Sequence, residues 1–228
     1  MEKRMAKNII RYGIWFLLIP AAIVLGITVF EDRQYAFVSL AVAALALIPL
    51  FMSFEKRTHK TTELVVIAVM TALSVLGRFI FAAIPGFKPV SAIVIITAMY
   101  LGGEAGFVTG ALSAFISNFY FGQGPWTPFQ MFIWGTIGIA AGLLANPLKR
   151  SKIILCVYGV IAGIVYSLFM DVWGVMWFDG VFNIDRYLAA LVTAIPYTLA
   201  YAASNVVFLL LLGKVIGQKL ERIRTKYI

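Results

Sequence analysis

Polar and aromatic side chains interrupt the apolar sequence most clearly between Asn118 and Met131. This stretch holds two glycines and two prolines within seven residues (122–128). Such a cluster forbids a continuous helix, because proline lacks a backbone N–H and glycine tolerates left-handed geometry. The amides, threonine and tryptophan of the stretch can form hydrogen bonds and stack on a ring, and irregular backbone at a membrane boundary must be buried in protein or line a cavity. We therefore expect a ligand-binding element here.

The residue types present favour binding over catalysis. The only acidic cluster is Asp171, Asp179 and Asp185, with no histidine or cysteine nearby, whereas an enzyme needs a nucleophile–base pair, a metal cluster or paired carboxylates. The single histidine, His59, lies in a basic segment, and the sequence contains no G-x-x-x-x-G-K-[ST] nucleotide motif. We expect no enzymatic activity, no metal site and no cofactor.

Composition identifies the class of protein. Of the 228 residues, 62% are hydrophobic and only 13% charged, against about 45–50% and about 25% in a soluble domain. The net charge of +9 does not indicate nucleic acid, because the basic residues form short clusters between apolar runs, as in the cytoplasmic loops of membrane proteins. The sequence predicts an all-α, multi-pass protein of the cell membrane, with the lipid bilayer as its surroundings.

The apolar runs divide into eight predicted membrane spans. The expected ranges are 13–30, 35–54, 63–84, 90–101, 107–121, 128–146, 153–170 and 187–212. The fourth and fifth are short for a membrane span, so tilting or shielding by neighbouring helices is expected. In the sixth, Gly135, Gly138 and Gly142 allow close contact between helices. The last is expected to kink or begin afresh at Pro196.

Charge asymmetry predicts the orientation. With eight spans, fifteen of the 19 Lys and Arg residues fall in the tails and even-numbered connections. The other side carries only Arg33, Arg78, Lys88 and Arg186. By the positive-inside rule both termini are cytoplasmic, and the 118–131 stretch faces outside.

Three outward connections, 85–89, 118–128 and 171–186, share an aromatic and polar character. With the helix ends beside them, they supply the predicted ligand-binding residues. These are Arg78, Phe87, Lys88, Asn118, Tyr120, Gln123, Trp126, Thr127, Gln130, Trp134, Asp171, Trp173 and Trp177. For the tryptophans an interfacial aromatic belt is the alternative explanation, with more weight for Trp173 and Trp177 than for Trp126 and Trp134.

Arg78 is the clearest charge inside a predicted span. A charged side chain at the bilayer centre costs at least about 2.5–3.5 kcal/mol, so two interpretations are open. Arg78 either extends outward to the interface, or faces a pocket and pairs with a ligand anion or with Asp171. Asn118 and Asn205 have the simpler alternative of hydrogen bonding between helices.

Three sequence features resemble the S components, the substrate-binding membrane subunits of energy-coupling factor (ECF) vitamin transporters. They are the Ala-x-x-x-Ala pattern at Ala68 and Ala72, the Leu-Gly-Gly-Glu-Ala-Gly-Phe turn at 101–107, and the Gly-Gln-Gly-Pro-Trp-Thr-Pro run at 122–128. The resemblance implies a six-span core over residues 61–228. Residues 1–60, with two further spans, lie outside it as an N-terminal extension.

The resemblance also implies a function and partners. An S component binds a vitamin-like small molecule from outside, docks on a transmembrane coupling protein with two ATP-binding subunits, and topples to release the ligand inside. Ala68 and Ala72 are then expected to contact the coupling protein. The sub-branch that the chain most resembles suggests cobalamin or a precursor. Riboflavin, a pyridoxine-type compound or a modified nucleobase are alternatives, as is a structural or assembly membrane protein without a ligand.

Overall fold

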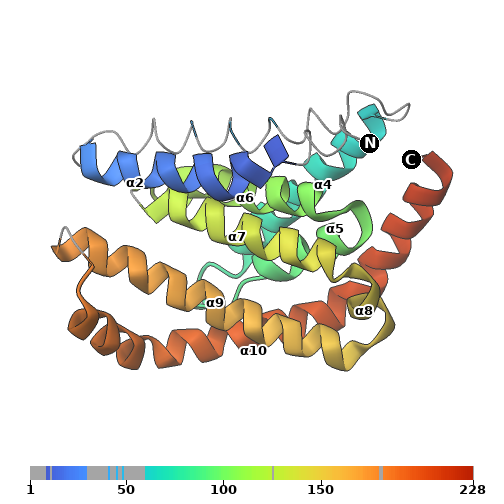
Figure 1. Cartoon of the computed structure of the whole chain (residues 1–228). Coiled ribbons are helices and arrows are strands. Elements are labelled where there is room, and N and C mark those ends of the chain that lie inside the picture. Colours follow the sequence, from blue (N-terminus) through green and yellow to red (C-terminus); the bar gives the residue numbers. More distant parts are fainter. Residues whose placement is uncertain are drawn as a thin grey trace.

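The computed structural model describes residues 9–10, 12–29, 41, 45, 48, 60–124, 126–179 and 182–227. Regular structure in these residues is helical throughout, as the composition predicts. The elements are η1 (Ile14–Leu18), α2 (Ile19–Val29), α4 (Lys60–Ile80), α5 (Val90–Leu101), α6 (Gly103–Phe121), α7 (Trp126–Leu143), α8 (Ala145–Arg150), α9 (Lys152–Asp179) and α10 (Ile184–Tyr227). The long helices lie side by side as a bundle (Figure 1).

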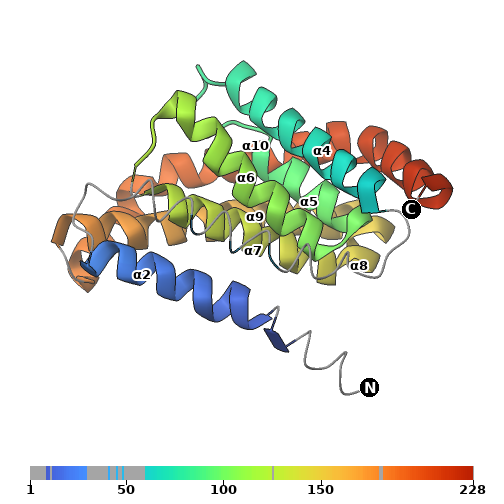
Figure 2. The same cartoon turned by 90° about the horizontal axis from the view of Figure 1, so that it is seen from above.

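Helix α5 is the centre of the bundle. Every residue from Val90 to Met99 is buried, and α4, α6, α7 and α10 all pack against it. A helix that is apolar on every side belongs in the interior, and only shielding by neighbours lets so short a helix stay at membrane depth. Figure 2 shows α5 enclosed between α4, α6 and α10.

The helix polarities give the bundle two distinct ends. The site end holds the C-terminal ends of α4, α6 and α9 and the N-terminal ends of α5, α7 and α10. The basic end holds the opposite termini of these helices, together with α8. From the charge asymmetry we expect the site end to face outside and the basic end to face the cytoplasm.

Glycines let α6 and α7 pack with their backbones in contact. A methyl group at Gly138 would lie 2.5 Å from the carbonyl carbon of Gly106, and one at Gly142 would lie 2.3 Å from the backbone nitrogen of Gly103. The prediction of close contact at Gly138 and Gly142 is therefore confirmed. The third glycine, Gly135, instead accommodates the ring of Phe107.

The N-terminal helix covers this same pair of helices. Trp15 is 2% exposed and stacks on Phe107 of α6 with the ring centroids 5.4 Å apart. Ile19 and Ile23, one and two turns further along, are buried as well. The first predicted span is thus packed on the bundle, whereas the second, 35–54, lies almost wholly outside the described residues.

Among the described residues, three helices are long and apolar enough to cross a membrane: Thr61–Ile80, Lys152–Asp179 and Ile184–Tyr227. They correspond to the third, seventh and eighth predicted spans. The segments Ile14–Leu25 and Val90–Leu101 are shorter apolar helices. The structure therefore supports a helical membrane protein, and the total of eight spans and the orientation stay predictions.

Two boundaries differ from the prediction. Helix α9 continues to Asp179, so most of the expected loop 171–186 is helical, because the tryptophans there are compatible with helix and no proline or glycine pair breaks it. Helix α10 runs unbroken through Pro196 and into the basic tail. Of the two outcomes expected at Pro196, a fresh start of the helix is therefore wrong, because the helix is continuous through the proline.

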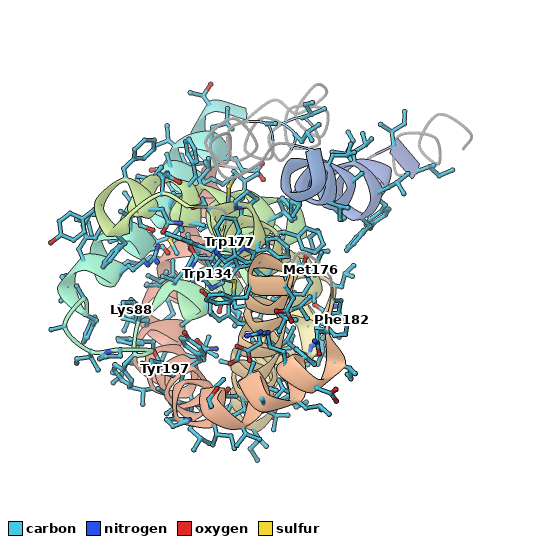
Figure 3. The ribbon with its side chains drawn as sticks, turned by 90° about the vertical axis from the view of Figure 1, so that its left-hand side faces the viewer. Lys88, Trp134, Met176, Trp177, Phe182 and Tyr197 are labelled. Atoms are coloured by element: carbon cyan, nitrogen blue, oxygen red, sulfur yellow. The ribbon has the colours of Figure 1, made fainter. Side chains whose placement is uncertain are left out.

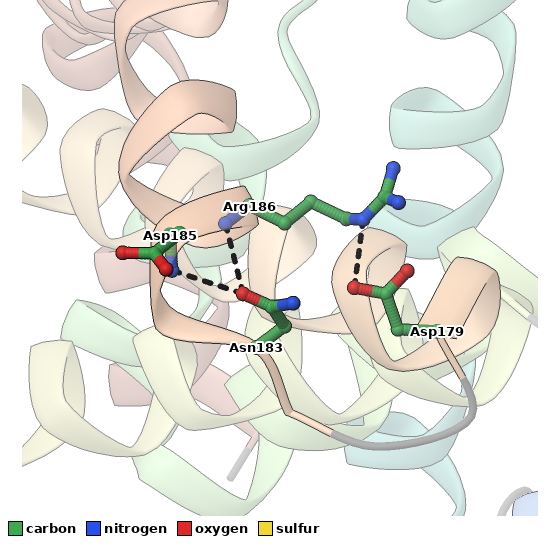
Figure 4. A network of polar contacts seen from close by, with 4 residues as sticks. All are labelled: Asp179, Asn183, Asp185 and Arg186. Carbon is green, nitrogen blue, oxygen red and sulfur yellow. Dashed lines mark hydrogen bonds and ion pairs between the residues drawn. The ribbon is translucent and has the colours of Figure 1, made fainter.

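Polar contacts join the end of α9 to the start of α10. Oδ1 of Asn183 accepts the backbone N–H groups of Asp185 and Arg186 at 3.0 and 3.1 Å, which caps the first turn of α10. Nε of Arg186 donates to Oδ2 of Asp179 at 2.7 Å. Figure 4 shows these contacts.

Candidate functional site

A buried arginine lies at the site end between α4 and α6. Arg78 is 9% exposed, and its Nη1 donates to Oγ of Ser117 and to Oδ1 of Asn118, the latter at 2.7 Å. A guanidinium carries five N–H donors. Nε and Nη2 form no hydrogen bond with any residue that the structure describes, so three donors of a buried cation are left for another acceptor.

Asn118 extends this contact into a chain of hydrogen bonds across three helices. Its Nδ2 donates to Oγ1 of Thr127 at 2.8 Å and to Oε1 of Gln130 at 2.9 Å. Nε2 of Gln130 in turn donates to the hydroxyl of Tyr166 on α9 at 3.1 Å. Because each amide has both a donor and an acceptor engaged, the side chains are held in one arrangement.

Aromatic rings line the other side of Arg78. Its Cζ lies 4.6 Å from the ring centroid of Phe121 and 5.4 Å from that of Trp134, within the range of cation–π attraction. Trp134 stacks on Tyr166 with centroids 5.1 Å apart, and Tyr166 meets Tyr201 of α10 edge-on at 5.0 Å. Three large rings from α7, α9 and α10 thus form a continuous aromatic wall.

These groups border a cavity of about 130 Å³. Its lining residues are Arg78, Gly86, Lys88, Val90, Ser91, Gln130, Trp134, Tyr166, Tyr201 and Asn205. The lining includes two cations and no carboxylate. Such a surface suits a flat ligand that stacks on rings and presents hydrogen-bond acceptors to the cations.

The connection between α4 and α5 forms the rim of the cavity. Gly86 has a φ of +72° and lies against α10, where a methyl group would be 2.8 Å from Cβ of Ala200. Nζ of Lys88 donates to the carbonyl of Ile84 at 3.1 Å. Burial lowers the pKa of Lys88, and the positive charge of Arg78 lowers it further. Figure 3 shows Lys88, Trp134 and Tyr197, from three separate elements, at this end of the bundle.

A second aromatic group lies beside the first. Trp126 meets Trp173 edge-on at 5.9 Å, and Trp173 stacks on Trp177 at 6.2 Å. Oε1 of Gln123, Oδ2 of Asp171 and Nε1 of Trp173 are buried without a hydrogen-bond partner in the described structure. None of these residues lines the cavity, so their assignment to the ligand site stays a prediction.

Two candidate residues lie away from the cavity. Phe87 packs into the core, with its centroid 5.2 Å from that of Phe208. Tyr120 is 72% exposed and contacts Phe79 and Phe121. Both belong to predicted loops, but Phe87 lies in the connection between α4 and α5 and Tyr120 in the last turn of α6.

Of the two interpretations of Arg78, the structure supports the one in which the side chain is buried inside the bundle. The side chain is buried rather than extended to the interface, and it bonds to Ser117 and Asn118 rather than to Asp171. Of the two partners left open for a buried Arg78, Asp171 forms no ion pair with it, because Ser117 and Asn118 of α6 supply oxygen acceptors. Pairing with a ligand anion stays a prediction. Hydrogen bonding between helices is confirmed for Asn118, and for Asn205, whose Nδ2 donates to the carbonyl of Gly159 at 3.0 Å.

Sequence reasoning found Arg78, Lys88, Gln130 and Trp134 but missed several partners in the lining and the network. The missed residues are Ser91, Ser117, Tyr166, Tyr201 and, as a lining residue, Asn205. All five lie inside predicted membrane spans, and the role expected of Asn205 was hydrogen bonding between helices. The sequence feature that could have indicated them is the pair Tyr166 and Tyr201, whose hydroxyl groups lie inside predicted membrane spans.

The predicted docking pair lies on another face. Ala68 and Ala72 are both exposed on α4, and a spacing of four residues places them one above the other. Exposed Val65, Val69 and Leu76 continue the same apolar surface. The geometry allows a partner helix to approach closely there.

Comparison with known proteins agrees with this arrangement. The family profile described as the ECF-type riboflavin transporter, S component, matches residues 58–222. Searches of curated proteins and of solved structures gave no match. The matched range begins just before α4, includes all elements of the site and leaves out the N-terminal extension. The chain therefore belongs to the family of ECF-type riboflavin transporter S components, which are transport subunits and not enzymes.

Proposed function

We propose that the chain is the substrate-binding subunit of an ECF importer and that it captures a flat, heteroaromatic vitamin at the Arg78 cavity. The observation that carries this proposal is the buried guanidinium of Arg78, which has three N–H donors without a hydrogen-bond partner among the described residues and lies beside an aromatic wall. A buried cation with unused donors is costly to keep unless a ligand acceptor uses them.

Riboflavin is the first ligand to test. Its flat ring system can stack on Trp134 and Tyr166, and its ring carbonyls can accept from Arg78 and Lys88. Its hydroxylated chain suits the second aromatic group, where the buried oxygens of Asp171 and Gln123 can accept hydroxyl protons. The family description names the same vitamin.

The cavity must widen for this ligand. Its volume of about 130 Å³ is below the roughly 300–1,000 Å³ of most ligand pockets. We propose that the connection 81–89 moves, because it joins two helices and carries the lining residues Gly86 and Lys88. This movement must release its contacts with α10, where Phe87 packs on Phe208 and the carbonyl of Lys88 accepts from Oγ of Ser204. Cobalamin, suggested by the sequence resemblance, requires a far larger opening, so it is the second ligand to test after riboflavin.

Import by this subunit then requires partners. We propose that Ala68 and Ala72 form the docking face for the transmembrane coupling protein, and that two ATP-binding subunits supply the energy. The ligand enters from the outside at the site end and is released inside after the chain topples, as the family resemblance implies.

The test is ligand binding by the purified full chain. Riboflavin, cobalamin, pyridoxine and a set of nucleobases are titrated by calorimetry, and quenching of flavin fluorescence gives a second measurement for riboflavin. The proposal expects submicromolar binding of riboflavin or another flat heteroaromatic compound. Tight binding of cobalamin alone would overturn the choice of ligand, and no binding by any member of the panel would overturn the function.

A further inference from the structure

The basic end of the bundle contains a separate pocket of about 370 Å³. It lies between the end of α5, the corner where α7 meets α8, and the last turns of α10. Its lining residues are Glu63, Ala98, Met99, Tyr100, Leu101, Gly102, Gly142, Leu143, Ala145, Asn146, Lys149 and Arg224. This pocket lies at the opposite end from the Arg78 cavity and shares no lining residue with it.

Two cations from different helices lie at this pocket. Nζ of Lys149 is 4.2 Å from the ring centroid of Tyr100 and 3.5 Å from Oε2 of Glu221. Exposed ion pairs of this length are weak and exchange readily with other anions. Arg224 forms no hydrogen bond or ion pair with any described residue. The remaining charge in the lining, Glu63, is 4% exposed and engaged in interactions of its own.

The surroundings of the pocket are strongly basic. Residues 145–152 and 214–227 together carry eight Lys and Arg against one acid, Glu221. Helix α10 has 44 residues, about 66 Å at 1.5 Å per residue, and a bilayer core spans only about 30 Å. Its last turns therefore extend beyond the hydrocarbon. Gly217 and Leu220 are buried there, whereas the Lys and Arg residues of these turns are exposed.

An apolar surface begins at the edge of the pocket. Leu143, which lines it, is 72% exposed, and Leu144 and Ile153 are 45% and 77% exposed. A free phosphate gains nothing from this apolar surface, because it has no apolar group. A phospholipid can use both features, since its headgroup binds the cations and its acyl chains contact the apolar side chains next to the pocket.

We propose that this pocket binds the anionic headgroup of a membrane phospholipid. Lys149 and Arg224 contact the phosphate, Asn146 and the hydroxyl of Tyr100 hydrogen-bond to the polar groups beside it, and the acyl chains lie along Leu143 and Ile153. Pockets lined by cations at the cytoplasmic ends of membrane helices bind anionic lipids by this chemistry. Because the site joins α8 to α10, a bound lipid holds the basic end at the membrane surface.

The test uses the purified full chain in neutral detergent. Native mass spectrometry counts bound lipid as short-chain phosphatidylglycerol, phosphatidylcholine or inorganic phosphate is added. The double variant Lys149→Gln/Arg224→Gln removes both pocket cations. The matched control Lys152→Gln/Lys214→Gln removes the same charge from the same end outside the pocket, and Lys149→Arg/Arg224→Lys keeps the charge.

We expect phosphatidylglycerol to bind about thirtyfold more weakly to the pocket variant and within about twofold of wild type to the control. The charge-conserving variant should retain binding, which separates loss of the site from loss of the fold. Equal weakening of the pocket variant and the control, no preference for phosphatidylglycerol over phosphatidylcholine, or equally tight binding of inorganic phosphate would each overturn the proposal.

Discussion

Nη1 of Arg78 donates a hydrogen bond of 2.7 Å to Oδ1 of Asn118, and this bond joins the ends of α4 and α6 beside the cavity. Asn118 then uses its own donors on Thr127 and Gln130 of α7. One buried cation and one amide thereby fix three helix ends around the proposed ligand.

The first prediction concerns the shape of that cation. Arg78→Lys keeps the charge but loses the planar fork of donors. We expect ligand affinity to fall about tenfold to a hundredfold, the magnitude of one or two hydrogen bonds to a charged group. Calorimetry gives the change. Arg186→Gln, which removes an exposed cation at the same end, is the control and should keep its affinity. An unchanged affinity in Arg78→Lys would show that the charge alone, and not the fork of donors, holds the ligand.

The second prediction isolates the tyrosine hydroxyl. Tyr166→Phe keeps the ring beside Trp134 but removes the acceptor for Nε2 of Gln130. We expect ligand affinity to fall about two- to tenfold, corresponding to one hydrogen bond of about 0.5–1.5 kcal/mol.

Tyr158→Phe is the matched control for this change. Its hydroxyl donates to the carbonyl of Ile137 at 2.6 Å and does not line the cavity. The control is expected to lower stability without changing affinity. An unchanged affinity in Tyr166→Phe would mean that Gln130 is not positioned through this bond.

The third prediction separates docking from binding. Ala72→Trp places a large ring on the exposed face of α4 and should abolish uptake by cells that carry the coupling proteins, while leaving the dissociation constant of the ligand unchanged. Val157→Trp on exposed α9 is the control and should keep uptake. Loss of binding in Ala72→Trp would refute the docking role.

Sequence patterns predicted the helical membrane class and a helix break near Gly122, because apolar runs and glycine–proline pairs act locally. The break is shorter than the expected connection 118–128, since α6 ends at Phe121 and α7 begins at Trp126. They also found Arg78 and Trp134, since a charge and a tryptophan with amides nearby stand out in an apolar chain. Tyr166 and Tyr201 were not predicted, because their place in the cavity lining depends on how α9 and α10 are rotated about their axes. The continuation of α9 past Asp171 was missed for a related reason: polar residues suggested a loop where packing favours helix.

The fourth prediction tests the glycine contact between α6 and α7. Gly138→Ala places a methyl group 2.5 Å from the backbone of Gly106, so the two helices must move apart. We expect a loss of roughly 1–3 kcal/mol in stability, the usual cost of overpacking, measured by unfolding in mixed detergent. Gly213→Ala, which meets only one side-chain atom at 3.8 Å, is the control. No difference between the two would show that the contact is looser in the membrane.

The last prediction concerns the N-terminal extension, which the family profile does not include. Trp15 is buried against Phe107, and Phe107 in turn contacts Gly135 of α7. The extension therefore contacts α7, the helix that carries Trp134, through the stacked rings of Trp15 and Phe107. If its role is to support the bundle, removing the first ring should weaken the fold and leave the ligand site intact.

Trp15→Ala is the variant that tests this role. We expect it to lower the free energy of unfolding by about 3 kcal/mol, as for other buried tryptophans replaced by alanine, with ligand affinity unchanged. Leu17→Ala removes a side chain that is 69% exposed and should change neither quantity. A drop in affinity without a drop in stability would instead connect the extension to the ligand site, because Phe107 and Gly135 then transmit its position to Trp134.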